Sequence, residues 1–302
     1  MYYASMQELV GNTPLVRLAH FSPSQDVALF AKLELYNPSG SVKDRTGRYM
    51  VESAEKSGLL KPGGTIVLGT AGNTGLGIAF AALNKGYRVI FTVPEKFSIE
   101  KQILMKALGA EIVHTPLEEG MIGANKRAAE LRAQIPGAVA LDQFSDQSNP
   151  QAHYETTGPE IDNDLDGNID YFVAGAGSGG TFTGVARYLK QKHPNLKAVL
   201  ADPVGSTIGG GTHADYLIEG IGNDFIAQTL DMTLVDQIYK ITDDEAFDAA
   251  RKAARLEGII AGSSSGAALA AALKLIQDGA KGNIVVIFPD RGDRYFSKKL
   301  FG

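Results

Sequence analysis

The stretch Asn37-Pro38-Ser39-Gly40-Ser41-Val42-Lys43-Asp44-Arg45 places one lysine between a Pro/Gly turn and the start of a helical pattern. Proline and glycine favour turns, and the residues from Thr46 onward read as a helix, so Lys43 is expected at a strand-to-helix junction. Reactive groups are often held on such loops. Most lysines are solvated, however, so by itself Lys43 also fits an ordinary surface position.

Composition indicates a globular protein that acts on small molecules. Of 302 residues, 44% are hydrophobic and 21% are charged, which is ordinary for a chain with a sizeable core. A net charge of −5 gives no basic footprint for nucleic acid. With 0 cysteines, thiolate nucleophiles and cysteine-bound metals are excluded, and no metal site is predicted. The N-terminus is not signal-like and no apolar run could span a membrane, so a cytoplasmic enzyme is expected.

Short apolar and β-branched runs alternate with helical patterns along the chain. Parallel strands that are covered on both faces have this continuous apolar character. The sequence therefore predicts the α/β class, with a mostly parallel sheet flanked by helices. The expected strands are Ala28–Leu35, Thr65–Gly69, Arg88–Val93, Glu111–His114, Ala138–Leu141, Tyr171–Ala174, Ala198–Ala201 and Asn283–Phe288.

Two predicted helices have recognisable capping residues at their ends. Thr242-Asp243-Asp244-Glu245 is a capping box, and Gly258 stands where a glycine commonly ends a helix. Ser98 is the expected N-cap of another helix, which Gly109 closes. The spacing of its apolar residues predicts a buried side formed by Ile99, Ile103, Leu104, Ala107 and Leu108.

The first of three glycine-bearing motifs is Gly69-Thr70-Ala71-Gly72-Asn73-Thr74-Gly75, between an expected strand and an apolar helix. Hydroxyl, amide and backbone N–H groups at a helix N-terminus can bind a carboxylate or a phosphate. The alternative is a polar turn in which the Thr and Asn side chains only cap the helix.

The second motif is Gly175-Ala176-Gly177-Ser178-Gly179-Gly180-Thr181. Its glycines fit the dinucleotide pattern G-x-G-x-x-G, and Asp202 follows at the distance of a ribose-binding acid. A nicotinamide enzyme is therefore one interpretation. The same turn could bind any phosphate monoester through its N–H groups and hydroxyls, or could be a tight turn without a ligand.

The third motif is Ala261-Gly262-Ser263-Ser264-Ser265-Gly266-Ala267-Ala268, ahead of an alanine-rich helix. One hydroxyl normally suffices to cap a helix, so three serines suggest a neutral hydrogen-bonding partner for a ligand. A redundant cap in a solvated turn is the alternative.

A lysine, an anion-binding turn, a phosphate-binding turn and a serine-rich turn together match the groups of pyridoxal phosphate and an amino-acid substrate. With these motifs in this order, the chain resembles the fold type II, or β-family, of pyridoxal phosphate enzymes, which includes cysteine synthase and cystathionine β-synthase. The resemblance extends over nearly the whole chain. The matching segments are Val10–Val16, Asn37–Arg45, Thr70–Gly75, Gly177–Thr181 and Gly262–Gly266.

The resemblance implies the tryptophan synthase β-like fold of that family, with two domains, each a mostly parallel twisted sheet flanked by helices. A smaller domain, residues 41–148, is expected to be inserted into a larger, cofactor-binding domain formed by residues 1–40 and 149–302, with the cofactor in the cleft. A homodimer is the usual assembly. Neither a haem segment nor a regulatory domain is expected.

Individual roles also follow from the resemblance. Lys43 is expected to bind the cofactor as a Schiff base and to move the substrate's Cα proton, which suits a desolvated lysine. Asn73 would hydrogen-bond the ring hydroxyl, and Ser264 would face the pyridine nitrogen, where a neutral hydroxyl leaves the ring a weaker electron sink than a carboxylate would. The residues implied to bind the phosphate are Gly177, Ser178, Gly179, Gly180 and Thr181. Those implied to bind substrate are Thr70, Ala71, Gly72, Asn73, Thr74, Gln143 and Gly220.

The chemistry implied by the family is β-replacement on serine or O-acetylserine, in which loss of the group on Cβ gives an α-aminoacrylate and a thiol then adds. The Ser-Val-Lys-Asp sequence ending at Asp44 separates the chain from the related dehydratases. Three groups of residues are more similar to cystathionine β-synthase than to cysteine synthase, which favours homocysteine as the thiol. They are Pro94-Glu95-Lys96 with Glu100-Lys101, Asp202-Pro203 followed by Gly205-Ser206, and the segment Tyr216–Phe225.

Two positions depart from the vertebrate form of that enzyme. Ala71 replaces a Ser, and the resulting Thr-Ala-Gly-Asn-Thr-Gly sequence resembles bacterial cystathionine synthases that use O-acetylserine. Asn223 stands where a Tyr often follows Glu-Gly-Ile-Gly. Cysteine synthase, with sulfide as the thiol, remains the alternative, and an NAD-dependent oxidoreductase is a more distant one.

The glycine-dense loop Gly205–His213 lies between Asp202 and the 219–225 segment. We hypothesise that it forms a mobile lip over the thiol entrance. The alternative is a solvated surface turn.

Overall fold

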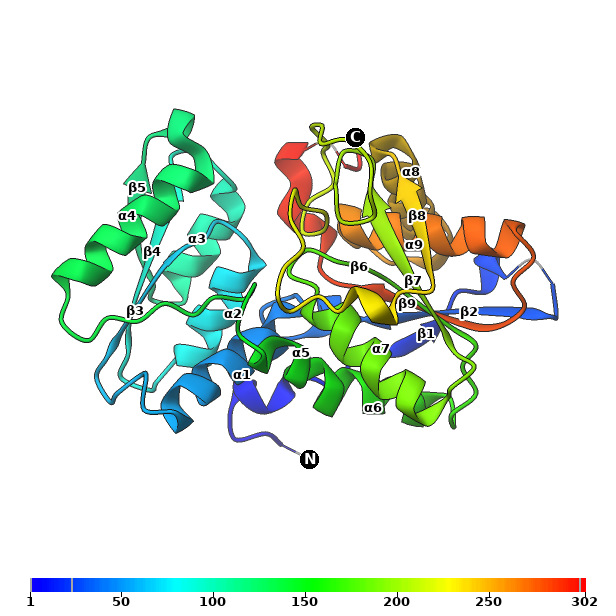
Figure 1. Cartoon of the computed structure of the whole chain (residues 1–302), viewed down its shortest axis with the longest axis horizontal. Coiled ribbons are helices and arrows are strands. Elements are labelled where there is room, and N and C mark those ends of the chain that lie inside the picture. The colour runs from blue at the N-terminus through cyan, green and yellow to red at the C-terminus, as the bar shows by residue number, and fades with distance from the viewer. Residues whose placement is uncertain (1, 23, 299) are drawn as a thin grey trace. The chain divides into compact units, whose positions relative to one another are not determined.

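The computed structural model describes residues 2–22, 24–298 and 300–302, and divides into two compact units (Figure 1). The first unit comprises Met1–Val10 and Lys43–Asn149, and the second comprises Gly11–Val42 and Pro150–Gly302. The unit boundaries differ from the expected domain boundaries by one or two residues at positions 41 and 148. The first ten residues, expected in the larger domain, group with the smaller unit because Gln7 Nε2 donates hydrogen bonds to the carbonyls of Phe80 (3.2 Å) and Leu83 (3.4 Å).

The first unit is a three-stranded parallel sheet of order β3-β4-β5 with helices on both faces. Ile66 and Phe91 pack with residues of α1, α2 and α3, whereas their neighbours Val67 and Ile90 pack with Ala128 of α4. Alternate residues of each strand thus face opposite helical layers. The elements are α1 (Lys43–Lys56), β3 (Thr65–Gly69), α2 (Asn73–Ala82), β4 (Arg88–Pro94), α3 (Ile99–Ala107), β5 (Glu111–Thr115) and α4 (Gly120–Gln134).

The second unit is a six-stranded sheet of order β1-β2-β9-β6-β7-β8, in which only the β1–β2 pair is antiparallel. Val173 and Val199 face the layer of α8 and α9, while Phe172 and Leu200 face that of α6 and α7. The strands are β1 (Leu15–Arg17), β2 (Val27–Leu33), β6 (Tyr171–Gly175), β7 (Lys197–Pro203), β8 (Gln237–Ile241) and β9 (Gly282–Phe288). The helices are α6 (Gly158–Asp164), α7 (Gly180–Lys192), α8 (Asp243–Glu257) and α9 (Ser263–Gln277), preceded by α5 (Ser148–Ala152) and a π-helical turn, His153–Thr157.

The expected α/β class with mostly parallel sheets is confirmed, and seven of the eight expected strands are present within two residues at either end. The exception is Ala138–Leu141, which forms only an isolated bridge between Val139 and Ile66. Two edge strands, β1 and β8, were not expected. Both are short and carry polar side chains among the apolar ones, so they lack the pattern of covered strands.

The predictions for the two helices with recognisable ends differ in outcome. The capping box of α8 is confirmed, with Thr242 and Glu245 bonded reciprocally and Gly258 in the left-handed region (φ 71°). For α3, the predicted N-cap bond and buried side are wrong, because Ser98 makes no side-chain capping bond and the side chains of Ile99, Ile103 and Leu104 are exposed. The predicted end of this helix is confirmed, because Gly109 follows the C-cap residue in the left-handed region (φ 84°). Gln102 accounts for the orientation of this helix. Its Nε2 donates to Phe97 O (2.7 Å) and its Oε1 lies 3.0 Å from His114 Nε2 on β5, which turns a polar face inward.

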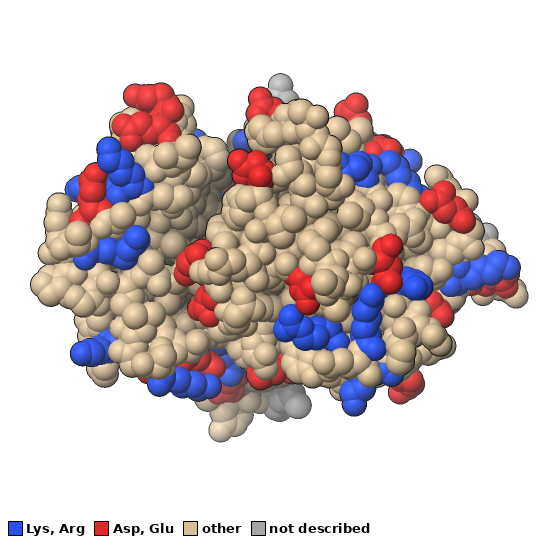
Figure 2. Space-filling view, viewed as in Figure 1, with Lys and Arg blue, Asp and Glu red and all other residues tan. Residues whose placement is uncertain are grey.

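The surface charge is mixed. On the face drawn in Figure 2, Lys and Arg side chains are interspersed with Asp and Glu. Several form ion pairs, such as Lys190 with Asp236 at 2.6 Å. Within the described residues, no helix has the length and apolar character needed to cross a membrane.

Candidate active site

Lys43 is the first residue of α1, and its backbone is fixed by a close helix crossing within the first unit. A Cβ on Gly77 would lie 2.1 Å from Lys43 O, and a Cβ on Gly47 would lie 2.3 Å from the Gly77 carbonyl carbon. The backbones of α1 and α2 therefore touch, which only glycine permits. Asn73 lies four residues before Gly77, about one helical turn away, so the structure brings Lys43 and Asn73 to neighbouring parts of one helix pair.

The loop Thr70–Thr74 leads from β3 into α2. Its N-cap residue is Gly72, which has no side chain to form a capping bond, and the Gly72 N–H donates to Thr70 Oγ1 at 3.4 Å. Thr74 Oγ1 donates to Gln143 Oε1 at 2.7 Å, which joins two expected substrate-binding residues that are 69 positions apart. Ala71 packs into the core of this unit, so its side chain is turned away from solvent.

Gln143 is itself held by its neighbours. Asn149 Nδ2 donates to Gln143 O at 2.9 Å, and Thr46 Oγ1 of α1 donates to Asn149 Oδ1 at 3.1 Å. The loop that carries Gln143 is therefore tied to the same helix that begins with Lys43.

In the second unit, the turn Gly175–Thr181 joins the carboxyl end of β6 to the N-terminus of α7. Gly179 is the N-cap residue with φ 83°, and a Cβ there would lie 2.4 Å from Leu230 Cβ. A Cβ on Gly177 would lie 2.5 Å from Gly220 O. The first turn of α7 contains no acidic residue. A tight turn with N–H groups and two hydroxyls at a helix N-terminus is suited to a phosphate.

A buried histidine also contacts this turn. His153 Nε2 lies 3.2 Å from Thr181 Oγ1, and its Nδ1 lies 2.9 Å from Thr157 Oγ1. This histidine begins a π-helical turn that precedes the glycine motif in the sequence. Sequence reasoning missed this residue because a π-helical turn has no local signature, although such turns are frequent at functional sites.

The serine motif lies at the start of α9. The N-cap residue is Gly262, so the three serines do not serve as redundant caps. Ser263 Oγ accepts the Glu219 N–H at 3.0 Å. A Cβ on Gly220 would lie 3.9 Å from Ser264 Oγ, so the glycine at 220 leaves the space beside this hydroxyl open.

Asp290 and Tyr295 pack against Gly262 of the serine motif. Tyr295 donates a hydrogen bond of 2.5 Å to Asp290 Oδ2, and a Cβ on Gly262 would lie 2.1 Å from Asp290 Oδ1. Burial, together with the neighbouring Asp290 carboxylate, raises the pKa of Tyr295 well above its ordinary value. Tyr295 therefore remains a neutral hydrogen-bond donor at physiological pH.

Asp202, the acid expected to bind a ribose under the nicotinamide interpretation, lies in β7 and is bonded to Lys240 of β8 and to the loop that follows β7. Its Oδ2 accepts bonds from Lys240 Nζ (2.6 Å) and from the Gly209 N–H (2.8 Å). Lys240 Nζ also donates to the carbonyls of Ser206 (2.6 Å) and Gly210 (3.0 Å). These bonds tie residues 205–210 to β8, and the mobile lip stays a prediction.

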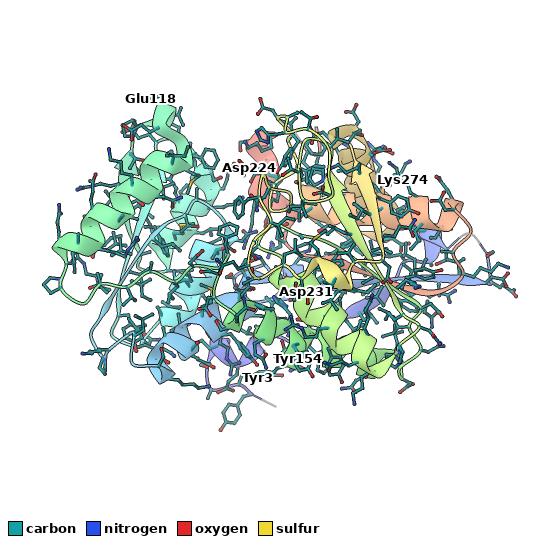
Figure 3. The ribbon with its side chains drawn as sticks, in the orientation of Figure 1. Tyr3, Glu118, Tyr154, Asp224, Asp231 and Lys274 are labelled. Carbon is teal, nitrogen blue, oxygen red and sulfur yellow. The ribbon has the colours of Figure 1, made fainter. Side chains whose placement is uncertain are left out.

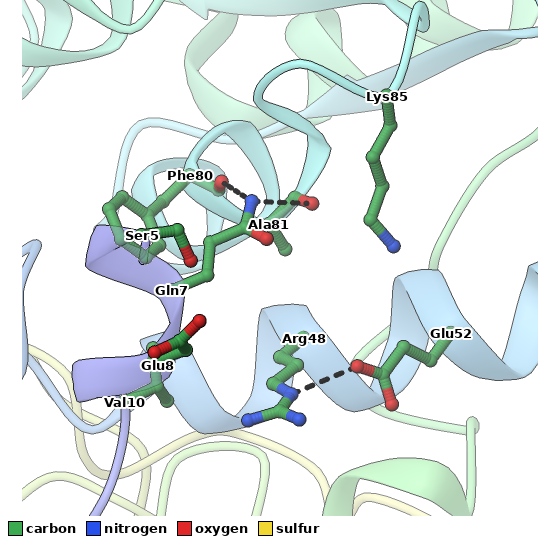
Figure 4. A pocket seen from close by; sticks show the side chains of 9 residues that line it. All are labelled: Ser5, Gln7, Glu8, Val10, Arg48, Glu52, Phe80, Ala81 and Lys85. Carbon is green, nitrogen blue, oxygen red and sulfur yellow. Dashed lines mark hydrogen bonds and ion pairs between the residues drawn. The ribbon is translucent and has the colours of Figure 1, made fainter. Parts of the chain in front are cut away.

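The first unit also has a cavity of about 370 Å³ that contains none of the expected site residues (Figure 4). Its charged side chains include Arg48 and Glu52, which pair with each other at 2.9 Å. The lining comprises Ser5, Gln7, Glu8, Val10, Arg48, Glu52, Phe80, Ala81 and Lys85.

Comparison with known proteins decides the family. The family model described as "Pyridoxal-phosphate dependent enzyme" matches residues 6–290. The chain belongs to this family. An O-acetylserine dependent cystathionine beta-synthase from Bacillus subtilis is 50% identical over 295 residues, which cover 97% of this chain and 96% of that protein. A cysteine synthase from Helicobacter pylori is 43% identical over 304 residues and the full length of both chains.

Solved structures agree with this assignment. A crystal structure of O-acetylserine dependent cystathionine beta-synthase from Helicobacter pylori covers both chains completely, with a TM-score of 0.93 and 43% identity. A cysteine synthase from Entamoeba histolytica gives a TM-score of 0.96 at 36% identity, covering 100% of this chain and 91% of that one. The expected fold type II architecture is thereby confirmed.

Pyridoxal phosphate is the cofactor of this enzyme family, and the nicotinamide interpretation has no support from the family match. The residues expected to bind pyridoxal phosphate have the space and the hydrogen-bonding groups that this cofactor needs. The Gly175–Thr181 turn is packed so tightly that side chains at 177 and 179 are excluded, and it offers N–H groups and hydroxyls to a phosphate. Gly220 leaves space beside the neutral Ser264 hydroxyl, which suits a pyridine nitrogen.

Proposed function

We propose that this chain is an O-acetylserine-dependent cystathionine β-synthase, which replaces the acetate group of O-acetylserine with homocysteine to give cystathionine. The observation that carries the proposal is the 50% identity, over nearly the full length of both chains, to a protein of that name. The Thr-Ala-Gly-Asn-Thr-Gly sequence that begins at Thr70 supports O-acetylserine as the donor, with serine as the other donor to test.

The cofactor, when bound, withdraws electrons from the substrate's Cα, which allows the group on Cβ to leave and a thiol to take its place. We assign its phosphate to Gly177, Ser178, Gly179, Gly180 and Thr181. Asn73 binds the ring hydroxyl. Ser264 binds the ring nitrogen with a neutral hydroxyl, which does not enforce protonation of that nitrogen.

Lys43 would hold the cofactor through its Nζ, and the same Nζ would act as the general base toward the substrate. Its Nζ takes the proton from the substrate's Cα and returns it after the thiol has added. The close contact of the Lys43 backbone with Gly77 supports this role, because a fixed backbone limits the positions that Nζ can reach.

The substrate carboxylate is assigned to the loop Thr70–Thr74 together with Gln143, and Gly220 completes the substrate contacts. The bond from Thr74 Oγ1 to Gln143 Oε1 supports this assignment. Because Thr74 binds the amide oxygen, the NH₂ group is the part of the Gln143 amide that is suited to a carboxylate.

Cysteine synthase activity, with sulfide as the thiol, is the second candidate. It is favoured by relatives of that name at 43% identity over 98% or more of this chain, including those of Helicobacter pylori and Staphylococcus aureus. Both candidates share the cofactor and the donor half-reaction and differ only in the thiol.

A matrix of two donors and two thiols tests the proposal. Serine and O-acetylserine are each offered with homocysteine and with sulfide, and cystathionine and cysteine are quantified by mass spectrometry. We expect the highest kcat/KM for the pair of O-acetylserine and homocysteine. Cysteine formed much faster than cystathionine at matched thiol concentrations would establish the second candidate instead.

We further propose that the enzyme is cytoplasmic and forms a homodimer. Sedimentation equilibrium over a range of protein concentrations measures the assembly, and a mass of one chain at micromolar concentration would refute the dimer.

A further inference from the structure

Three consecutive carbonyls of the glycine turn are held by one segment of the second unit. The Gly222 N–H donates to Ala176 O at 2.8 Å. Asn223 Nδ2 donates to Gly177 O at 2.9 Å, and Thr229 Oγ1 donates to Ser178 O at 2.5 Å. Asp224 and Asp231, both labelled in Figure 3, lie just after Asn223 and just after Thr229 and mark the course of this segment.

These bonds determine the direction of the next three N–H groups. In a planar trans peptide, the carbonyl of one residue and the N–H of the following residue point in opposite directions. Because the carbonyls of residues 176–178 point toward the 222–229 segment, the N–H groups of residues 177–179 point away from it. They continue the row of N–H groups that begins α7 at Gly180.

The Asn223 side chain extends from a fixed backbone. The Asn223 N–H donates to Ser206 Oγ at 3.1 Å, and Asn223 O accepts the Thr207 N–H at 2.8 Å. Ser206 O is in turn bound by Lys240 Nζ at 2.6 Å. The backbone that carries the Asn223 amide is therefore connected to β8 through Ser206 and Lys240.

Thr229 is also constrained, because the residue is almost completely buried (1% exposed). Two residues later, the Asp231 N–H donates to Thr183 Oγ1 of α7 at 2.9 Å, which fixes the far end of the segment. One backbone group and two side chains thus hold the three carbonyls, and only the two side chains can be removed by substitution.

We propose that Asn223 and Thr229 are positioning residues that orient the N–H groups of the glycine turn toward the cofactor phosphate. The inference rests on the proposed cofactor site and assigns no contact with the cofactor to either residue. Preorganised donors bind an anion more tightly because no peptide group has to rotate when the anion arrives.

The test compares two ligands that differ only in the phosphate. Apoprotein is titrated with pyridoxal phosphate and with pyridoxal, and the dissociation constants are measured by absorbance. In Thr229→Val, which removes the hydroxyl and keeps the shape, the constant for pyridoxal phosphate should rise about tenfold, the change expected for one buried hydrogen bond. The constant for pyridoxal should stay within about twofold of wild type, because pyridoxal has no phosphate for the turn to bind. Asn223→Leu should act in the same direction.

Two variants serve as controls. Thr229→Ser keeps the donor and should bind pyridoxal phosphate as wild type does. Thr92→Val removes an equally buried hydroxyl that donates to Ala124 O in the first unit (2.7 Å), and should leave the preference for the phosphate unchanged. The ³¹P NMR signal of the bound cofactor should shift in Thr229→Val and not in Thr92→Val.

Equal losses for both ligands, or unchanged affinity for both, would overturn the proposal. Failure of the proposed cofactor site is a separate outcome, because wild-type protein would then bind pyridoxal phosphate no better than pyridoxal. Should Asn223→Leu fail to fold, the isosteric Thr229→Val variant and its Ser control still decide the question.

Discussion

At the scale of single residues, the hydroxyl of Thr74 sets the orientation of a side-chain amide. Its bond to Gln143 Oε1 (2.7 Å) directs the NH₂ group of Gln143 away from Thr74. In Thr74→Val this bond is lost, so the amide can turn and present its oxygen to an incoming carboxylate. We expect KM for O-acetylserine to rise about tenfold or more, which corresponds to one charge-assisted hydrogen bond, with little change in the affinity for pyridoxal phosphate.

Thr74→Ser is the matched control for that variant, because it keeps the hydroxyl and should retain a KM near that of wild type. Steady-state kinetics and cofactor titration of the two variants provide the measurement. A Thr74→Val enzyme with wild-type KM would show that the bond between Thr74 and Gln143 has no part in substrate binding.

Residues of this site were predictable from local sequence only where they form contiguous motifs, and Gln143, 69 positions from Thr74, was expected only through the family resemblance. Lys43, the glycine turn and the serine motif each form a contiguous pattern whose chemistry can be read directly. Asn223, Thr229 and His153 meet the glycine turn across 46, 51 and 28 positions, respectively, and nothing in their local sequence indicates a partner. Sequence reasoning noticed Asn223 only as a departure from its family.

At the scale of elements, covered strands and bonded helix ends were predictable, whereas burial on α3 was not. The apolar spacing of α3 predicted a buried side, but hydrogen bonds from Gln102 to Phe97 and His114 determine which side faces the sheet. Leaving such a polar group buried without a partner costs about 1–3 kcal/mol, which is comparable to the gain from burying one more aliphatic side chain. A pattern of hydrophobicity does not contain this information.

The crossing of α1 and α2 gives a prediction at this scale. Gly77→Ala would place a methyl group 2.1 Å from Lys43 O, so the helices must separate. We expect a loss of about 2–3 kcal/mol in the free energy of unfolding, as for other overpacked sites. Because Lys43 begins the displaced helix, the visible absorbance of the bound cofactor should also change.

Gly63→Ala separates packing from backbone strain. Gly63 has φ 71°, and no atom lies within 4 Å of the position that an alanine methyl group would take, so alanine there is strained but unobstructed. We expect a smaller loss of about 1 kcal/mol and an unchanged cofactor spectrum. Urea unfolding and absorbance spectra of both variants provide the comparison, and equal effects at Gly63 and Gly77 would contradict the importance of the crossing.

At the scale of the whole molecule, the assignment of cofactor contacts to both units has a measurable consequence. A ligand that binds only the native state protects the segments that it contacts from local opening. Hydrogen–deuterium exchange should therefore slow on addition of pyridoxal phosphate in residues 70–75 of the first unit and in residues 175–181 of the second. The edge strand β8 and the helix α4, which carry none of the assigned residues, serve as internal references.

The variant Lys43→Ala should affect the protection from hydrogen exchange differently in the two units. The variant loses the attachment of the cofactor to the first unit but keeps every residue assigned to the phosphate, so residues 175–181 should still be protected by pyridoxal phosphate. Protection of residues 70–75 should fall sharply, because Lys43 and Asn73 share one helix pair. Protection lost to the same degree in both segments would mean that Lys43 is needed for phosphate binding, and protection unchanged in both would remove Lys43 from the cofactor site.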